Sequence, residues 1–456
     1  MLVVPVRKGY SGITIDLGLL HIYSALKAKG IVSTIMHCPK DGITEEKFRE
    51  ILQANLHIKT IGFKMFSVDH NSVKRMSLIA KQVLPECVTV AGGPHPTCLP
   101  EYILEDMPGI DYVFRGEGEA GFPVFCEKVL AGKPLLEAPN IAYRREKGVV
   151  QNKCVAVDEL DRLPRIQWED VSIEDYPDFL TSLPFIPVMA TRGCPFQCKY
   201  CAAHSIVGRK MRYRSVENVI DELRFLKETH KIEGFNFSDD ELTLNRNYFI
   251  DLCKGLIKSG LNLKWECSNG VRLDTLDDEV LDIMYKAGCR YISVGIESGN
   301  NRILKSMKKN ISTEVIREKV AMVKRSKVVP QGLFMVGFPD ETEEDIRKTI
   351  DFAIELDIDK TNFSIFMPLP GSEIFDELVA GGALEIDRIN WDDMKPDKVI
   401  FRNSLVSPEK LKQLQRYAYM KFYLRLKPLK RLFREFVLKK RGGRALFVKL
   451  KSVLSS

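Results

Sequence analysis

Residues 185–204 read FIPVMATRGCPFQCKYCAAH, an apolar strand followed at once by a loop with three cysteines. The loop carries Cys194, Cys198 and Cys201 in the spacing CxxxCxxC. Thiolates at these spacings can converge on one face of a cubane iron–sulfur cluster, and three ligands leave the fourth iron open to another molecule. The stretch therefore predicts a 4Fe-4S cluster at the carboxyl end of a strand.

Two other interpretations of the loop stay open. A structural zinc site normally takes four protein ligands, often as paired CxxC elements, and His204 is a candidate fourth ligand three residues after Cys201. Chance clustering of buried cysteines is the second alternative. The other eight cysteines stand among apolar or turn residues, where a free cysteine usually packs as a small buried hydrophobic group. They are Cys38, Cys87, Cys98, Cys126, Cys154, Cys253, Cys267 and Cys289.

The cysteine loop opens a series of alternating strands and helices. Between the strands lie helical patterns such as VENVIDELRFLKETH. Six strand–helix units in about 200 residues predict a partial, TIM-like (β/α)6 barrel, in which active sites lie at the carboxyl ends of the strands. The expected strands are residues 185–191, 234–240, 263–269, 291–297, 331–338 and 361–368.

At these residues the sequence resembles the radical S-adenosylmethionine superfamily. Gly193, Pro195 and Tyr200 fit the usual cluster loop of that family, and the resemblance extends over roughly Phe185 to Asp397. It implies that the amino and carboxylate groups of S-adenosylmethionine chelate the open iron. It also implies that an electron donor such as a flavodoxin or ferredoxin reduces the cluster, which then releases a 5′-deoxyadenosyl radical.

The same resemblance assigns contacts to S-adenosylmethionine after the second strand. Asp239, Asp240 and Glu241 occupy the place where the family binds the methionine amino group, and carboxylates suit an ammonium partner. The alternative is a solvated acidic turn.

Three further contacts are implied after the third and fourth strands. Ser268 and Arg272 lie where polar groups meet the methionine carboxylate, and Glu297 lies where the family often contacts the ribose hydroxyls. Arg272 as a surface ion-pair partner and Glu297 as a helix cap are the alternatives. VGFPDET (336–342) and PLPGSE (368–373) resemble the fifth and sixth strand-end loops of the family, or simply make turns.

The first 130 residues form an earlier alternating series. Residues 17–30, 45–53, 72–83 and 123–130 have helical patterns, separated by short apolar runs such as VTVAGG. This alternation predicts a doubly wound, Rossmann-like α/β domain with a parallel sheet covered on both faces, and with ligands at the carboxyl ends of its strands.

A parallel-sheet domain before a radical barrel resembles the cobalamin-binding domain of the cobalamin-dependent radical enzymes. The matching segments are an early loop from Gly9 to Gly18, AGGPHPT (91–97) and FRGEGE (114–119), and glycines let backbone approach the nucleotide tail of the corrin closely. The chain lacks the DxHxxG motif that supplies a histidine to cobalt in other cobalamin proteins. Plain turns, and a turn or surface histidine at residue 95, are the alternatives. The implied cobalamin contacts are Gly92, Gly93, His95, Gly116 and Glu117.

Composition sets the remaining expectations. We place the domains at residues 1–138, 185–400 and 401–456, with a proline-rich linker at 139–184 that begins with a short hairpin. No apolar run approaches the roughly 20 residues that cross a bilayer, and the first residues lack the pattern of a signal peptide, so a cytoplasmic protein is expected.

The C-terminal segment 401–456 is basic. It holds sixteen lysines and arginines against two glutamates, a net charge of +14 that leaves −7 on the first 400 residues. Its aromatic and basic residues alternate at helical spacing, which is compatible with a helical cap on the barrel, with contact to an anionic membrane at its inner face, or, less readily, with nucleic acid.

These features predict a radical enzyme with a 4Fe-4S cluster, S-adenosylmethionine and cobalamin. A C-methyltransferase acting on an unactivated carbon of a small molecule or lipid is the leading interpretation. A cobalamin-dependent cyclase or rearrangement enzyme is the alternative within enzymes, and a non-catalytic cluster-binding or electron-transfer protein is the alternative from another class. A methylthiotransferase is disfavoured, because that group normally carries further cluster cysteines in a different N-terminal domain.

Overall fold

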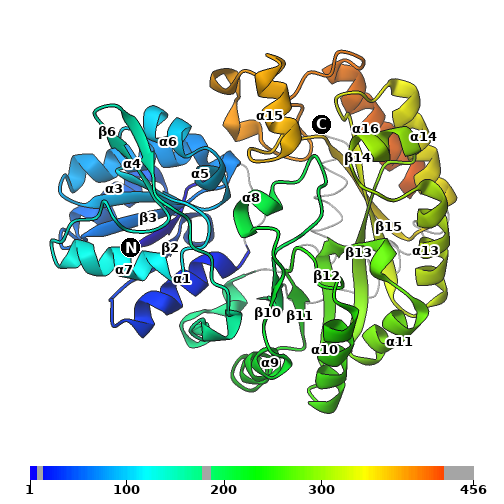
Figure 1. The fold of residues 1–456 in the computed structure, drawn as a ribbon, viewed down its shortest axis with the longest axis horizontal. Helices are drawn as coiled ribbons and strands as arrows, with labels where there is room; N and C mark the ends of the chain where they lie inside the picture. The colour runs from blue at the N-terminus through cyan, green and yellow to red at the C-terminus, as the bar shows by residue number, and fades with distance from the viewer. Residues whose placement is uncertain (8–13, 177–185, 426–456) are drawn as a thin grey trace.

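The computed structural model describes residues 1–7, 14–176 and 186–425. Two α/β units lie side by side, the N-terminal one in blue and cyan and the second running from green to red (Figure 1). No helix within these ranges is both long and apolar enough to cross a membrane.

The first unit is a seven-stranded sheet in the order β2-β1-β3-β4-β5-β6-β7. Strands β1 to β5 are parallel, as predicted, but β6 and β7 form an antiparallel hairpin on β5. The hairpin that the sequence places at the start of a linker therefore extends this sheet, because Ile141 and Ala142 bury their side chains against its core. The strands are β1 (Leu2–Val4), β2 (Ile35–His37), β3 (Thr60–Lys64), β4 (Val88–Gly92), β5 (Tyr112–Phe114), β6 (Ile141–Arg145) and β7 (Gly148–Gln151).

Helices connect these strands at close to the predicted positions. They are α1 (Leu17–Ala28), α2 (Cys38–Asp41), α3 (Glu45–Gln53), η1 (Ser67–Asp69), α4 (His70–Val83), α5 (Pro94–Cys98), α6 (Pro100–Asp106) and α7 (Gly121–Leu130).

The second unit is a parallel sheet of six strands in the order β15-β14-β13-β12-β11-β8. The predicted partial barrel is confirmed. The first strand is the shortest, because the chain leaves the sheet to form the small β9–β10 ladder that carries the cysteine loop. The strands are β8 (Pro187–Val188), β9 (Thr191–Arg192), β10 (Arg212–Tyr213), β11 (Gly234–Phe237), β12 (Lys264–Val271), β13 (Cys289–Glu297), β14 (Val329–Val336) and β15 (Lys360–Ile365).

The helices of this unit start where a polar side chain can accept a hydrogen bond from the first turn. Ser215, Asn245, Asp277, Ser312 and Thr342 cap α9, α10, α11, α13 and α14 in this way. The helices are α8 (Ala203–Val207), α9 (Val216–His230), α10 (Arg246–Lys258), η5 (Leu273–Thr275), α11 (Asp278–Lys286), α12 (Asn301–Ser306), α13 (Thr313–Arg325), α14 (Glu343–Glu355), α15 (Glu373–Ala380), η6 (Ile386–Arg388), η7 (Trp391–Asp393) and α16 (Pro408–Tyr423).

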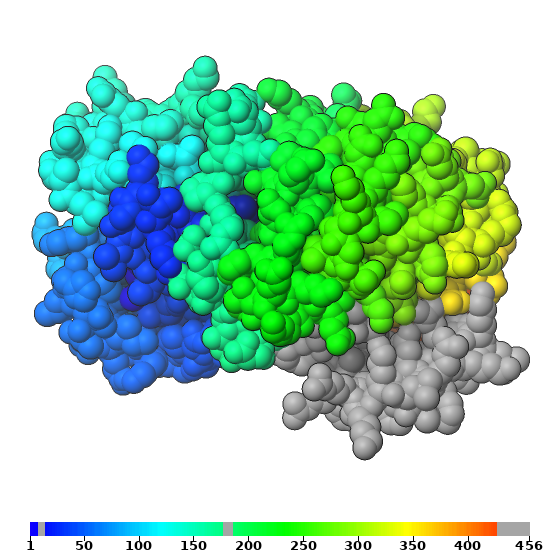
Figure 2. Space-filling view, turned by 90° about the horizontal axis from the view of Figure 1, so that it is seen from below, coloured from blue at the N-terminus to red at the C-terminus, as the bar shows by residue number. Residues whose placement is uncertain are grey.

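The segment between the two sheets ties them together. It contains the short turns η2 (Leu160–Arg162), η3 (Trp168–Asp170) and η4 (Ile173–Asp175), and it runs between the two units on the face seen in Figure 2. The Trp168 indole donates to Glu222 of α9 over 2.8 Å, and the Gln167 amide donates to Ser24 of α1 over 3.0 Å. One apolar cluster accordingly includes Ile15 and Leu20 of the first unit together with the core of the second.

Helix α16 begins the basic segment and packs on the barrel. Leu411, Leu414, Ala418 and Phe422 are buried, and the Tyr419 hydroxyl accepts from the Phe363 amide of β15. Up to residue 425 the helical-cap interpretation is therefore confirmed. The basic residues after 425, and with them the membrane and nucleic-acid interpretations, lie outside the described residues.

Candidate active site

The cysteine loop lies between β9 and α8 and is fixed by its own backbone. Cys194, Cys198 and Cys201 are all half-buried. Gly193 has φ +110°, and a Cβ atom there would lie 2.3 Å from the Lys210 carbonyl oxygen, so only glycine fits. The Lys199 amide donates to the Met307 carbonyl over 2.9 Å. The backbone of the loop that carries the three cysteines is thus held in place next to the strand ends.

The remaining cysteines largely confirm the packing expectation. Six of the eight are buried, Cys98 is half-buried, and Cys154 is exposed, which the sequence did not predict. Cys154 is exposed because it follows the hairpin strand β7 at the edge of the sheet. In the part of the chain that the structure describes, no three His, Cys, Asp or Glu side chains are placed to hold a single metal ion.

The three acidic residues after β11 have different surroundings. One Asp239 carboxylate oxygen accepts from the amides of Ala190 and Thr191, while the other has no partner among the described residues. Burial raises the pKa of Asp239 to about 7. Glu241 accepts from the amide and hydroxyl of Thr243, whereas Asp239 and Asp240 both line a cavity. Asp239 therefore positions the turn before the cluster loop.

Arg272 contacts the cluster loop itself. Its guanidinium lies 3.8 Å from the ring centre of Phe196, between the first two cysteines, and it pairs with Asp274 at 2.6 Å. The ion pair predicted as an alternative is present, with Arg272 buried and Asp274 exposed. Ser268 donates to the Asn236 side chain over 3.0 Å and so lies at the neighbouring strand end.

Glu297 ends β13 in a left-handed conformation with φ +64°. Its Oε1 accepts from the Tyr200 hydroxyl over 2.9 Å and from the Lys309 ammonium over 3.0 Å. It does not cap α12, because Asn300 does so. Lys309 is buried next to the cluster loop and was missed from the sequence, where no motif distinguishes it from the neighbouring lysines.

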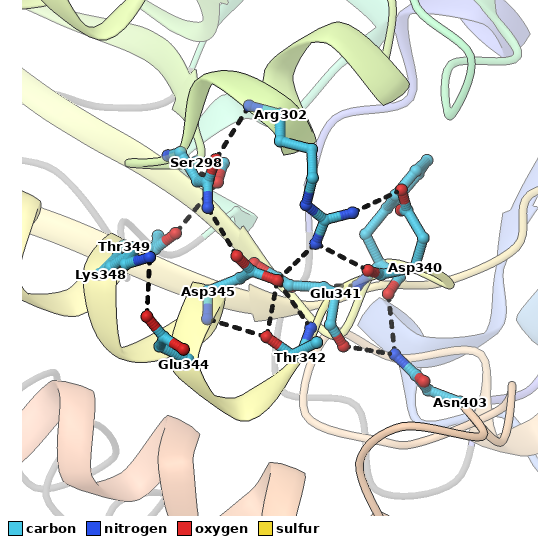
Figure 3. A network of polar contacts seen from close by, with 12 residues as sticks. Ser298, Arg302, Asp340, Glu341, Thr342, Glu344, Asp345, Lys348, Thr349 and Asn403 are labelled. Atoms are coloured by element: carbon cyan, nitrogen blue, oxygen red, sulfur yellow. Dashed lines mark hydrogen bonds and ion pairs between the residues drawn. The ribbon is translucent and has the colours of Figure 1, made fainter.

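The loop after β14 braces this region. Glu341 accepts from the amides of Gly337 and Phe338, and Arg302 bridges Asp340 and Asp345 (Figure 3). Ser298, directly after Glu297, shares a hydrogen bond of 3.0 Å with Thr349 of α14. The VGFPDET segment therefore supports the neighbouring strand ends.

A cavity of about 430 Å³ joins the two units. Its inner end is apolar and is formed by Leu2, Val90, Phe114 and Phe122 together with Gly62. Its outer end is lined by the second unit, at Thr191, Arg192, Ser238, Asp239 and Asp240.

The predicted glycine contacts line this cavity. Gly92, Gly93, Gly116 and Glu117 are all on its wall. Gly93 has φ +108°, and a Cβ there would lie 3.0 Å from the Met65 carbonyl oxygen, so backbone forms the surface at this point. The cavity fits the nucleotide tail of a corrin cofactor, because its lining combines apolar side chains with the glycines at 92, 93 and 116.

Glu117 has a second role that the sequence did not indicate. It pairs with Arg212 at 2.6 Å and with Arg192 at 3.4 Å, and Glu119 pairs with Arg192 at 2.8 Å. All four side chains are almost fully buried. The loop after β5 is thus bonded directly to the ladder that carries the cysteines.

His95 is neither a surface histidine nor part of the cavity wall. It is 1% exposed, shares hydrogen bonds with Ser67 (3.0 Å) and His70 (3.1 Å), and His70 in turn bonds to Asp106 (2.9 Å). Trp391 of η7 packs edge-on against His95 and stacks on His70. These partners occupy both ring nitrogens of His95, so neither nitrogen is free to bond to a molecule in the cavity.

Comparison with known proteins agrees with this arrangement. Residues 188–353 match the radical SAM superfamily, and residues 4–125 match the B12 binding domain. An uncharacterized methyltransferase of Pyrococcus horikoshii is 34% identical over 77% of this chain and 75% of that protein. The anaerobic magnesium-protoporphyrin IX monomethyl ester cyclase of Rubrivivax gelatinosus is 29% identical over 82% of this chain and 68% of its own length. OxsB, solved as a cobalamin-dependent S-adenosylmethionine radical enzyme with aqua-cobalamin and S-adenosylmethionine bound, superposes with a TM-score of 0.73 at 17% identity, covering 99% of this chain and 71% of that chain.

The chain belongs to the radical S-adenosylmethionine superfamily, in the group whose radical domain follows a B12-binding domain. It is a cobalamin-dependent radical enzyme, and its cofactors are a 4Fe-4S cluster, S-adenosylmethionine and cobalamin. Enzymes of this superfamily need an electron donor and act on a substrate.

Proposed function

We propose that this enzyme is a C-methyltransferase that acts on an unactivated carbon. The observation that carries the proposal is the single cavity that reaches from Gly92 and Gly93 of the first unit to Asp240 of the second. A substrate at its outer end would lie between the two cofactors. The most similar relative named above, at 34% identity, is described as a methyltransferase and supports the same reading.

The bound cofactors supply a 5′-deoxyadenosyl radical and a transferable methyl group, and the chain's residues hold them in place. Cys194, Cys198 and Cys201 would ligate the cluster, and Asp240 would meet the ammonium group of S-adenosylmethionine. Glu297, fixed by Tyr200 and Lys309, would present its second carboxylate oxygen to the ribose hydroxyls.

Other assigned residues would hold these groups indirectly. Asp239 fixes the amides of Ala190 and Thr191 just before the loop, and Arg272 packs on Phe196 within it. Ser268 and Arg272 are the proposed neighbours of the methionine carboxylate. Gly116 and Glu117 would lie beside cobalamin, while His95 would act only by fixing the loop that contains Gly93.

The test is a label balance with anaerobically reconstituted enzyme. Methyl-labelled S-adenosylmethionine, cobalamin and a small-molecule and lipid extract are incubated with a low-potential reductant. Label in a new product together with 5′-deoxyadenosine supports methyl transfer. If no 5′-deoxyadenosine forms although the cluster is intact, the result would contradict the proposed radical reaction. The Cys198→Ala variant is the blank.

A cyclase or rearrangement enzyme is the second candidate, and the similarity to the Rubrivivax gelatinosus cyclase favours it. It predicts 5′-deoxyadenosine and a changed product without incorporated label. The same assay therefore separates the two reactions.

A lipid substrate and peripheral contact with a membrane extend this proposal. The basic residues after 425 are the reason to expect membrane contact. Helix α16 packs into the barrel core, so a truncated chain should end at Arg425 and keep α16. Flotation of the full chain with anionic liposomes, and not of the truncated chain, is expected. Equal flotation of both chains would contradict membrane contact through this segment.

A further inference from the structure

The imidazole of His21 on α1 is buried without a hydrogen-bond partner. It is 7% exposed, and both of its ring nitrogens lack a partner within the described ranges. A buried polar group left unsatisfied is costly, and such groups usually have a partner in the functional state. His21 lines the cavity between the two units, so a molecule in that cavity can reach it.

The charged groups around His21 are occupied by one another. Glu119 faces it but bonds to Arg192 at 2.8 Å, and Glu222 faces it but bonds to Arg214 at 2.6 Å. Burial lowers the pKa of His21 to about 4, so the ring is neutral at physiological pH. A neutral imidazole offers one N–H donor and one nitrogen acceptor.

His21 lies between the apolar part of the cavity and the part lined by Glu119 and Arg192, because both of these charged residues face it. Its neighbours on α1, Leu19 and Ile22, line the same slot as Phe114 and Phe122. The apolar part of the cavity suits a flat aromatic base such as the one that ends the nucleotide tail of cobalamin. The ribose that joins base to ring carries hydroxyl groups, which both donate and accept.

We propose that His21 hydrogen-bonds the nucleotide tail of bound cobalamin and so selects the complete cofactor over a tail-less corrinoid. This inference concerns the cofactor site and does not depend on which reaction the enzyme performs.

The test compares the affinities of cobalamin and cobinamide, which has the corrin ring but lacks the nucleotide. Binding of each to the full-length enzyme is measured by the quenching of tryptophan fluorescence and by the corrinoid absorption spectrum. For His21→Phe we expect cobalamin to bind about tenfold more weakly, the loss of one buried hydrogen bond, and cobinamide to bind as in the wild type.

Two further variants make the result decisive. His21→Gln keeps a donor and an acceptor and is expected to recover most of the cobalamin affinity. His57→Phe, at an exposed site just before β3, is expected to change neither affinity. The proposal is overturned if His21→Phe weakens both corrinoids equally or neither of them. Because the readout is binding, a failure of methyl transfer would leave this result standing.

Discussion

Arg192 and Glu119 form a buried ion pair between the two units, with 2.8 Å between the guanidinium and the carboxylate. Arg192 stands two residues before the first cluster cysteine, and Glu119 lies in the loop that follows β5 of the B12-binding domain. The pair therefore links the cysteine loop to the cavity wall of the B12-binding domain by a direct bond, and its removal should disturb both.

Glu119→Gln is expected to lower the free energy of unfolding by about 3 kcal/mol, because it leaves a buried guanidinium without its main partner. Urea denaturation measures the loss, and a double-mutant cycle with Arg192→Met isolates the interaction energy between the two side chains. The exposed pair Glu159–Arg162 is the control, and Glu159→Gln should cost about 0.5 kcal/mol or less. Equal losses for both glutamates would contradict a special role for the buried pair.

The Arg192–Glu119 pair should make the free energy of unfolding depend on pH in the acidic range. Burial opposes ionisation of Glu119, but Arg192 holds the pKa of the carboxyl below its ordinary value of 4.5. The stabilisation is therefore complete above pH 4.5 and is lost as the pH falls below it. Glu119→Gln should be less sensitive to acid in that interval than the wild type.

The cluster ligands can be separated from other cysteines by iron content. Replacing Cys194, Cys198 or Cys201 by alanine should abolish the visible absorption of the reconstituted cluster and the cleavage of S-adenosylmethionine. Cys154→Ala, at an exposed position, should retain both. Full iron and sulfide content in any of the three loop variants would contradict the assignment.

His70 and His95, which pack against Trp391, should lower the free energy of unfolding at mildly acidic pH. Burial lowers the pKa of both His70 and His95 from 6.5, and His70 lowers that of His95 further. The unfolded chain thus binds more protons below pH 6.5, and the free energy of unfolding should fall as the pH drops through that value, by up to about 1.4 kcal/mol per pH unit and proton. Urea titrations at several pH values, followed by tryptophan fluorescence, measure this slope. His95→Asn should flatten it and the exposed His57→Asn should not.

Glu341 should make the free energy of unfolding depend on pH in the opposite direction, with a loss as the pH rises. Burial raises its pKa to about 8, so the folded chain holds a proton that the unfolded chain loses above pH 4.5. Wild-type stability should fall, relative to Glu341→Gln, as the pH rises from 4.5 to 8. Glu344→Gln, at an exposed position on the same loop–helix junction, should show no such trend. Parallel pH profiles for wild type and Glu341→Gln would contradict a protonated Glu341.

The sequence by itself determined the two α/β units and the positions of most of their strands and helices, and it predicts the three cluster ligands. These follow from local signals, because strand–helix alternation, helix caps such as Ser215 and the CxxxCxxC spacing are all read along the chain. Gly93 also follows from a local signal, since the turn at the end of β4 needs a residue with positive φ there.

The tertiary structure alone decided which polar side chains share a partner across the two units. Glu117 and His95 were both expected beside cobalamin, yet Glu117 also bonds to Arg212, 95 residues away, and His95 turns to His70 and Trp391. His21, Lys309 and Trp391 carry no motif that marks them. Their roles depend on burial and on contacts between residues far apart in the chain, and burial is decided only when the two units pack together.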